Sequence, residues 1–497
     1  MKHRFLPIQL LKQYSSHGHR FLPRNLHFFN CINQRSYTKG HTTQEVEPKV
    51  QRISEFFIKP KYDSDESKQP LYLAPWDLTM LSAHYIQRGL LFRKPPAADG
   101  REDFLKTVLN RLKRSLSLAL VHFYPLSGRL VTEMNESQPS CLIFVDCNNS
   151  PGAKFIHAAV DLKVSDILSP IDVPSTVQSF FDHDTAVNFD GHTLPLLSIQ
   201  VTELKDGIFI GCSMNHSIAD GNSFWHFLNT WSEIFQADDD ISISRPPIHK
   251  RWFPDGYGPI INLPFTHQDE FISRYQAPEL RERIFHFSTE SIAKLKAKVN
   301  AECKSENISS FQSLSALVWR CITRARRLPQ DQITSCKLMI NNRSRMDPPW
   351  SQDYFGNSIH IVAGVATAGE LLQGNHGWAA WQLHQAVNNH TDKVLRGWLQ
   401  NWLQSPTVSQ LSQYFDRYSL LIGSSSRFNM YGTEFGMGKA VAIRGGNGNK
   451  FDGKVSSYPA NHEGGGSIDF EVCLAPETMS ALESNFEFMD AVSVSHD

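Results

Sequence analysis

The sequence predicts two α/β sandwiches, each built on a mixed sheet. Three observations support this prediction. The chain has 497 residues, more than one ordinary hydrophobic core accommodates. Strand-like and helix-like segments alternate in both halves, and a proline-rich stretch at residues 238–268 lies between them. Because proline at this density continues neither a helix nor a central strand, this stretch is predicted to be a crossover linker.

The first half begins with a predicted strand that contains Val50 and Phe57. Residues 103–122 are predicted to form an amphipathic helix, because apolar side chains recur there at helical spacing with basic residues on the opposite face. Pro125 and Gly128 end this helix. Further strands are predicted from Arg129 onward and over residues 141–145, 197–201 and 207–214.

The second half repeats this alternation. Ser309 or Ser310 is predicted to cap the N-terminus of a helix that runs to about residue 326. Another amphipathic helix is predicted around residues 378–399. The remaining elements are a helix over residues 291–299 and strands over residues 285–287, 336–340, 359–365, 420–422, 439–443 and 468–474.

The first 44 residues have a composition of their own. They contain no aspartate or glutamate, and their basic residues are interspersed with leucine, phenylalanine and serine, as in a transit peptide. The alternative is a leader without a function. We therefore expect a cytoplasmic protein, with import into a mitochondrion or plastid as the alternative. The predicted divisions are a leader at residues 1–45, an N-terminal domain at 46–237, the linker at 238–268 and a C-terminal domain at 269–497.

Composition argues against several classes of protein. The formal net charge is −1, which gives no field strong enough to attract nucleic acid or an acidic membrane. The eight cysteines are scattered without a Cys-x-x-Cys pair, so no metal site is predicted and the cysteines are expected to be reduced thiols. No apolar run approaches the roughly 18–20 residues that cross a bilayer. We expect a soluble protein without a metal, a nucleic-acid partner or a membrane anchor.

His216 is the strongest candidate for a catalytic residue. It follows the apolar run 207–214 and precedes an aromatic helix predicted over residues 223–235, so it lies in a tight loop between a buried strand and a helix. A neutral imidazole at a pocket wall accepts a proton from a hydroxyl or an amine. The alternative is a core histidine satisfied by main-chain carbonyls, with Asp220 capping the following helix.

No recognised nucleophile accompanies His216. The chain contains no Gly-x-Ser-x-Gly elbow, so direct attack by an acceptor is favoured over a covalent acyl-enzyme. The glycines between residues 432 and 438 lack the spacing of a phosphate-binding loop, and the segment 429–439 is predicted to be a tight structural turn.

Several of these segments together resemble one family, the plant BAHD acyltransferases with a His-x-x-x-Asp-Gly motif. His216, Asp220 and Gly221 match that motif. Residues 433–438 are similar to the family's Asp-Phe-Gly-Trp-Gly motif. The resemblance extends from about Val46 to the C-terminus and includes Tyr354, Phe355, Gly356 and Asn357, residues 124–130, and residues 309–320.

The resemblance implies two chloramphenicol-acetyltransferase-like domains with an active-site channel at their interface. His216 would deprotonate the acceptor, and acyl-CoA would be a co-substrate rather than a bound cofactor. Asp220 would pair with an arginine, for which Arg345 is favoured over Arg343. Ser309 and Ser310 are candidates for binding CoA, and a monomer is expected. Structural roles are implied for Gly221, Glu434, Phe435, Gly436 and Gly438.

The implied reaction is transfer of an acyl group from a CoA thioester to a hydroxyl or amine of a plant specialised metabolite. The identities of acyl donor and acceptor stay open, as does the choice between O- and N-acylation. Two departures from the family pattern are Glu434 in place of Asp and Met437 in place of Trp. The alternatives are a lyase of the same fold, or a non-catalytic binding or regulatory protein.

Overall fold

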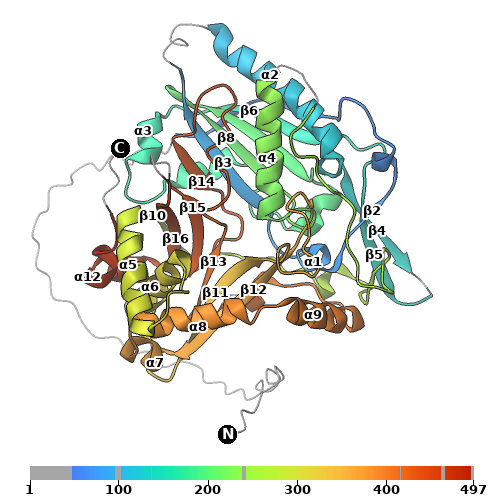
Figure 1. The fold of residues 1–497 in the computed structure, drawn as a ribbon. Coiled ribbons are helices and arrows are strands. Elements are labelled where there is room, and N and C mark those ends of the chain that lie inside the picture. Colours follow the sequence, from blue (N-terminus) through green and yellow to red (C-terminus); the bar gives the residue numbers. More distant parts are fainter. Residues whose placement is uncertain are drawn as a thin grey trace, which may run out of the picture. The chain divides into compact units, whose positions relative to one another are not determined.

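Two six-stranded sheets form the framework of the computed structural model (Figure 1). The structure describes residues 48–95, 102–135, 137–237, 242–414, 416–460 and 465–493. The predicted leader at residues 1–45 lies outside these ranges. Residues 47–497 group into one compact unit.

The first sheet belongs mainly to the N-terminal half and has the strand order β1-β6-β7-β8-β3-β14. Every residue of β8 is buried, as the apolar run predicted. Helices α2 (Glu102–His122) and α4 (Gly221–Gln236) share the main apolar core with this sheet. The strands are β1 (Gln51–Ile58), β3 (Ile86–Arg93), β6 (Ala153–Ala159), β7 (Leu197–Glu203), β8 (Gly207–Met214) and β14 (Ala442–Gly445).

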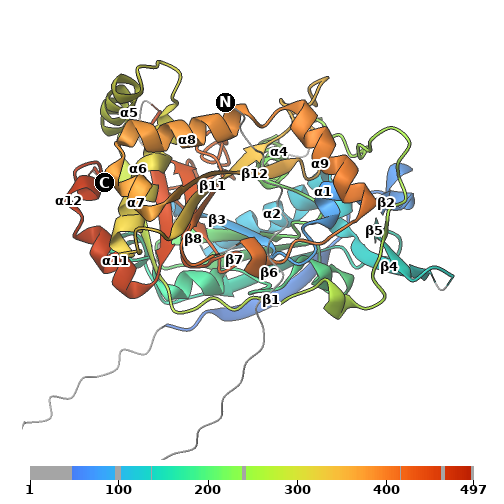
Figure 2. The ribbon, with the colours of Figure 1, turned by 90° about the horizontal axis from the view of Figure 1, so that it is seen from below.

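The second sheet has the strand order β10-β16-β15-β13-β11-β12. Helices on one of its faces enclose a second apolar core, and Figure 2 shows them outside this sheet. These helices are α5 (Thr289–Cys303), α6 (Ser310–Ala325), α8 (His376–Asn388) and α11 (Pro476–Glu483). The strands are β10 (Arg281–Phe287), β11 (Ile333–Asn341), β12 (Ile359–Thr367), β13 (Leu420–Gly423), β15 (Lys454–Pro459) and β16 (Ile468–Leu474).

Smaller elements complete the described part of the chain. A third sheet, β2-β5-β4, also pairs with β9. Its strands are β2 (Leu71–Tyr72), β4 (Arg129–Asn135), β5 (Ser140–Asp146) and β9 (Asn262–Leu263), and the further helices are α1 (Pro75–Leu78), α3 (Val164–Leu168), α7 (Ala368–Gln373), α9 (Asp392–Gln404), α10 (Leu411–Tyr414) and α12 (Phe486–Met489).

The mixed sheets with helices packed on them confirm the predicted fold class. Local predictions also hold where the sequence carries a specific signal. Ser309 is the N-cap of α6, and its hydroxyl accepts a hydrogen bond from the main-chain N–H of Gln312 at 3.2 Å.

The single helix predicted around residues 378–399 is wrong, because the segment forms two helices, α8 and α9. Between Val387 and Val394 the sequence is polar throughout, so the apolar spacing is interrupted at the break. Asn389 is the C-cap of α8, Thr391 is the extended N-cap of α9, and His390 between them shares a 2.9 Å hydrogen bond with the side-chain carbonyl of Asn342. A polar segment therefore separates the two helices.

Strand β14 is the one element that joins the two halves within a sheet of the described chain. The strand predicted at residues 439–443 lies at Ala442–Gly445 and pairs antiparallel with β3, with Ala442 opposite Leu91. The chain then returns to the second sheet as β15. The domain limits predicted from the sequence stay predictions.

No helix in the described ranges is both long and apolar enough to cross a membrane. The compartment of the protein stays a prediction.

Candidate active site

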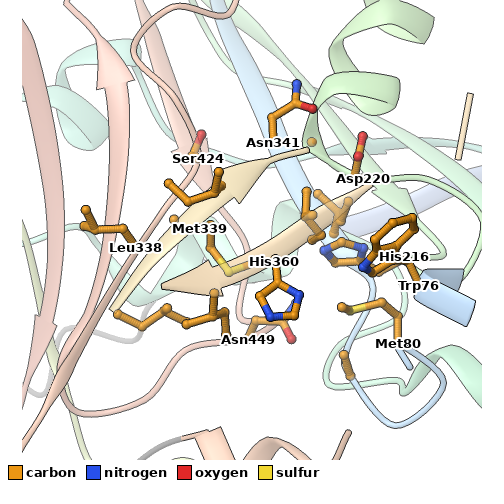
Figure 3. Close-up of a pocket in the computed structure, with 18 of the residues that line it drawn as sticks. Trp76, Met80, His216, Asp220, Leu338, Met339, Asn341, His360, Ser424 and Asn449 are labelled. Atoms are coloured by element: carbon orange, nitrogen blue, oxygen red, sulfur yellow. The ribbon is translucent and has the colours of Figure 1, made fainter. Parts of the chain in front are cut away.

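A cavity of about 1270 Å³ lies among residues of both large sheets. Figure 3 shows His216, Trp76 and Met80 around it, together with His360 and Met339 from the second sheet. Residues that are far apart in the sequence therefore lie around His216 in this cavity.

His216 is held by its main chain. Its N–H donates to the side-chain oxygen of Asn188 at 2.6 Å, and its carbonyl accepts from the side-chain amide of Asn357 at 2.7 Å. Nδ1 of the ring is buried and forms no hydrogen bond with any residue that the structure describes. Because the ring lines the cavity, Nε2 is the nitrogen that a molecule there can reach.

Burial is the main influence on the charge of His216. Desolvation lowers the pKa of the imidazole below its ordinary value of 6.5, against the opposing influence of its own carbonyl and of the Asp220 carboxylate. The ring is therefore neutral at pH 7, which is the state that accepts a proton.

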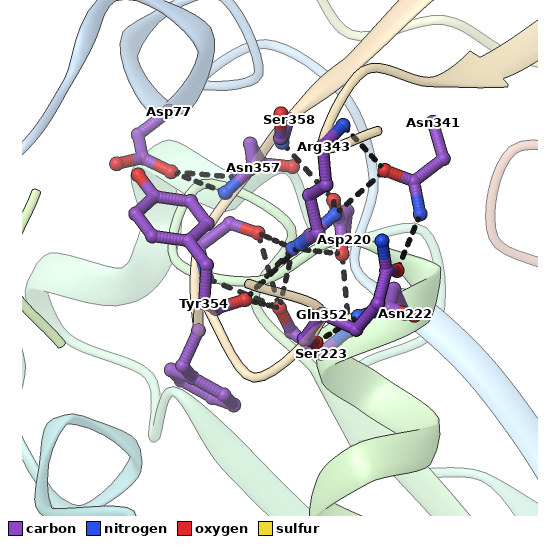
Figure 4. Close-up of polar contacts among 12 residues, drawn as sticks. Asp77, Asp220, Asn222, Ser223, Asn341, Arg343, Gln352, Tyr354, Asn357 and Ser358 are labelled. Atoms are coloured by element: carbon purple, nitrogen blue, oxygen red, sulfur yellow. Dashed lines mark hydrogen bonds and ion pairs between the residues drawn. The ribbon is translucent and has the colours of Figure 1, made fainter. Parts of the chain in front are cut away.

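Asp220 fixes the turn that follows His216. It is the N-cap of α4, and its carboxylate accepts hydrogen bonds from the main-chain N–H groups of Ser223 and Ser358, each at 3.0 Å. Arg343 donates to the same carboxylate from both terminal nitrogens, at 2.7 and 3.1 Å, as Figure 4 shows. Burial raises the pKa of Asp220, but Arg343 and the N–H donors outweigh it, so the net pKa is lowered and the carboxylate stays charged.

The pairing of Asp220 with Arg345, favoured from the sequence, is wrong. Arg343 and Asp220 are both fully buried and face each other, whereas Arg345 turns away and donates to the main-chain carbonyls of Val387 and His390, each at 2.9 Å. The two arginines are two residues apart in a turn after β11, so their side chains take different directions. Both were candidates, and only the tertiary structure distinguishes them.

A second buried ion pair supports the same loop, and sequence reasoning assigned it no role. Asp77 of α1 accepts a 2.7 Å hydrogen bond from Arg251, which also donates to the carbonyls of Ile218 and Phe355. Asn357 connects this pair to the histidine, since its side-chain amide donates to Asp77 at 3.0 Å (Figure 4) and also to the His216 carbonyl. Two features of the sequence could have indicated this ion pair. One is the acidic residue Asp77 within the apolar segment 73–81, and the other is the Tyr-Phe-Gly-Asn motif that ends at Asn357.

The segment around Phe435 does not line the cavity. Phe435 is buried against Trp231 and Phe235 of α4, with ring centroids 4.5 and 5.7 Å apart. Gly436 and Gly438 have φ values of 70° and 78°, a region that favours glycine, and so form the turn that presents Phe435. The main-chain N–H of Glu434 donates to Ser232 at 3.0 Å.

The other predicted site residues differ in position. Ser309, Asp220 and Gly221 lie on the cavity wall, whereas Ser310 is not among its described lining residues. In the part of the chain that the structure describes, no three histidine, cysteine, aspartate or glutamate side chains are grouped so as to hold a metal.

Comparison with known proteins identifies the family of this chain. The model of the Transferase family matches residues 48–489. The chain belongs to the BAHD acyltransferases. It is thus an acyl-transferring enzyme. An uncharacterised acetyltransferase of Arabidopsis thaliana is 36% identical to it over 88% of this chain and 98% of the relative.

Solved structures agree on the fold. This BAHD protein is similar to vinorine synthase, with a TM-score of 0.68 and 21% identity over 90% of this chain and 99% of that one. It is also similar to Fusarium graminearum TRI101 in complex with coenzyme A and T-2 mycotoxin, with a TM-score of 0.66 and 16% identity over 85% of this chain and 98% of that one.

Proposed function

We propose that this protein transfers an acyl group from a CoA thioester to the hydroxyl or amine of a plant specialised metabolite, with His216 as the general base. The observation that carries the proposal is a neutral imidazole on a cavity wall whose Nδ1 is buried and whose Nε2 is accessible. The complex of TRI101 with coenzyme A and a mycotoxin supports a CoA thioester and a small-molecule acceptor.

In the proposed reaction, Nε2 of His216 takes the proton of the acceptor as its oxygen or nitrogen bonds to the thioester carbonyl carbon. The carbonyl electrons move onto oxygen and form a tetrahedral oxyanion. When the carbonyl reforms, the carbon–sulfur bond breaks and the thiolate takes the proton from His216. The products are the ester or amide and free CoA, so the base is regenerated.

Asp220 acts in this proposal as a positioning residue. Its carboxylate is fully occupied by Arg343, Ser223 and Ser358, which leaves it no role in proton transfer. The ion pair and the helix cap instead hold the main chain between Met214 and α4 in one conformation. A catalytic ring that stays in place needs little reorganisation when the acceptor binds.

Aromatic side chains on the cavity wall support an acceptor or acyl group with a large apolar part. Trp76, Trp225, Trp398 and Trp402 all line the cavity, and Trp76 stacks on Trp398 with centroids 5.7 Å apart. Such walls bind planar apolar molecules by area burial and ring stacking. A monomeric state stays a prediction.

The test is release of free thiol from a panel of acyl-CoAs with and without hydroxylated or amino acceptors. We expect thiol release that depends on the acceptor, and a loss of at least about hundredfold in turnover for His216→Ala. His267→Ala is the matched control, because His267 is exposed and is not one of the residues that line the cavity.

Wild-type turnover in His216→Ala would contradict the role of His216. Product from a single substrate in the absence of CoA would instead assign a lyase activity.

A further inference from the structure

The second sheet has two different faces. Along β15 and β16, Val455, Phe470 and Val472 point into the core under the helices. The alternating residues Lys454 and Glu471 line the cavity instead. The charged side chains of this wall thus belong to the same cavity as His216.

Arg88 of the first sheet joins this wall from the opposite side. It also lines the cavity, and its guanidinium donates to the hydroxyl of Ser456 at 3.3 Å and lies 5.7 Å from the ring centre of Tyr458. A cation from each sheet, Arg88 and Lys454, therefore faces the same space.

The carboxylates near this wall are already engaged. Glu282, which does not line the cavity, pairs with Lys450, and Glu471 accepts hydrogen bonds from the Tyr458 hydroxyl at 3.1 Å and from the main-chain N–H of Gly445 at 3.3 Å. Nζ of Lys454 forms neither an ion pair nor a hydrogen bond with any residue of the described ranges. This part of the lining thus contains three cations, Arg88, Lys450 and Lys454, and one carboxylate, Glu471.

Lys454 stays cationic at neutral pH although its surroundings oppose the charge. Burial, together with the nearby charge of Arg88, lowers the pKa of its amine to about 8. Lys454 is half-buried, and a charge that is partly removed from water without a partner is unfavourable; the usual remedy is an opposite charge within hydrogen-bonding distance. The amine lies directly against Gly423, where an added Cβ would come within 2.5 Å of Nζ.

We propose that Lys454, assisted by Arg88, binds a carboxylate on one of the two substrates of the reaction. The amine of Lys454 and the guanidinium of Arg88 offer donors for the two oxygens of a carboxylate, whereas the exposed Arg427 at another part of the wall is a freer partner for phosphate. This proposal rests on the proposed function in one respect, because the carboxylate is assigned to an acceptor or to an acyl-CoA. Binding of the carboxylate can be measured without turnover.

The experiment compares Lys454→Met with wild type by calorimetric binding of three matched probe pairs. Mandelate and coumarate against their methyl esters test a carboxylate on the acceptor, malonyl-CoA against acetyl-CoA tests one on the acyl group, and CoA against dephospho-CoA tests a phosphate. Lys337→Met is the control, because Lys337 pairs with Asp416 outside the cavity wall.

We expect wild type to bind the carboxylate-bearing member of at least one probe pair more tightly than its neutral counterpart. In Lys454→Met the affinity for that member should fall by about 10- to 100-fold, the range of a hydrogen bond to a charged group. Affinity for the neutral partner should not change. Because the amine has no partner among the residues that the structure describes, the variant should melt at the same or a higher temperature, whereas replacement of a lysine with a structural role would lower the melting temperature.

Three results would overturn the proposal: no preference of wild type for any acid, equal losses for acid and ester, or a loss confined to CoA relative to dephospho-CoA. If acid binding depends on Lys454 but no acyl-CoA yields product, the proposed function fails while this site stands. If transfer proceeds but Lys454→Met alters no acid-to-ester ratio, the site fails alone.

Discussion

The two motif segments of this chain hold opposite ends of one helix by different physical means. Asp220 caps the N-terminus of α4 and is paired with Arg343, whereas Phe435 packs against Trp231 and Phe235 near the C-terminal end of the same helix. The 16 residues of α4 extend about 24 Å between these ends. Hydrogen bonds and an ion pair thus fix the end of α4 next to His216, and packing of aromatic rings fixes the other end.

This difference explains which motif tolerates substitution. A buried ion pair has narrow requirements for charge and geometry, since loss of one partner leaves the other uncompensated. Packing of an aromatic ring depends on volume, while Glu434 contacts α4 through its main-chain N–H and Met437 is a partly buried side chain at the same core. The departures at Glu434 and Met437 from the family pattern are therefore compatible with an unchanged cavity.

The largest effect is expected from breaking the ion pair. Arg343→Met should lower the free energy of unfolding by about 3–5 kcal/mol, because Asp220 would stay buried without its partner. Arg345→Met is the matched variant two residues away and should have a smaller effect, since Arg345 bonds only to main-chain carbonyls at a half-buried site. Urea unfolding of both variants measures the difference. Equal losses would show that the ion pair has no special part in stability.

Phe435→Ala tests the opposite end of α4. Removal of a buried ring should lower the free energy of unfolding by about 3 kcal/mol. Turnover per folded molecule should not change, because Phe435 lies away from the cavity. Thermal unfolding combined with activity below the transition checks this. A drop in turnover at temperatures where the variant is fully folded would mean that packing at this end of α4 influences the position of His216.

The pH dependence of kcat/KM separates the base from the ion pair. Since the pKa of His216 is lowered below 6.5, the rate should hold from pH 7 to 6.5 and fall only at lower pH, tenfold per pH unit once the ring is protonated. The pKa of Asp220 is lowered below 3.8, so its contribution to stability is present above that value and lost only as pH falls further. An acid limb above pH 6.5, or unfolding that coincides with it, would contradict this assignment.

Glu434→Asp should have the smallest effect, within about 0.5 kcal/mol in unfolding free energy. The residue contacts α4 through its main-chain N–H, which the substitution retains. Chemical denaturation beside wild type measures it. A loss as large as that of Phe435→Ala would assign the carboxylate arm a role in the packing.

Sequence reasoning succeeded where the signal is local. The apolar run of β8, the cap at Ser309 and the loop that carries His216 each depend on neighbours within a few residues, and all lie where the sequence predicts. It failed where partners are distant. Arg343 lies 123 residues from Asp220, and Asp77 lies 174 residues from Arg251, so no spacing rule relates them.

The break between α8 and α9 is a failure of a different kind. The segment 388–393 is polar throughout, which is a local signal for the break, and His390 within it contacts Asn342. The charged wall around Lys454 could not be predicted either. The sequence does not show which face of a strand borders a cavity until the position of the opposite sheet is known.

Strand β14 constrains how the protein reaches its native state during synthesis. The sheet that starts at Gln51 gains its last strand only when Ala442–Gly445 has left the ribosome, and until then the border of β3 lacks its main-chain partners. The sheet of the N-terminal half, which is synthesised first, is therefore completed only late in synthesis. An unprotected β3 border is the place where a chaperone, or a second nascent chain, would find an open strand to pair with.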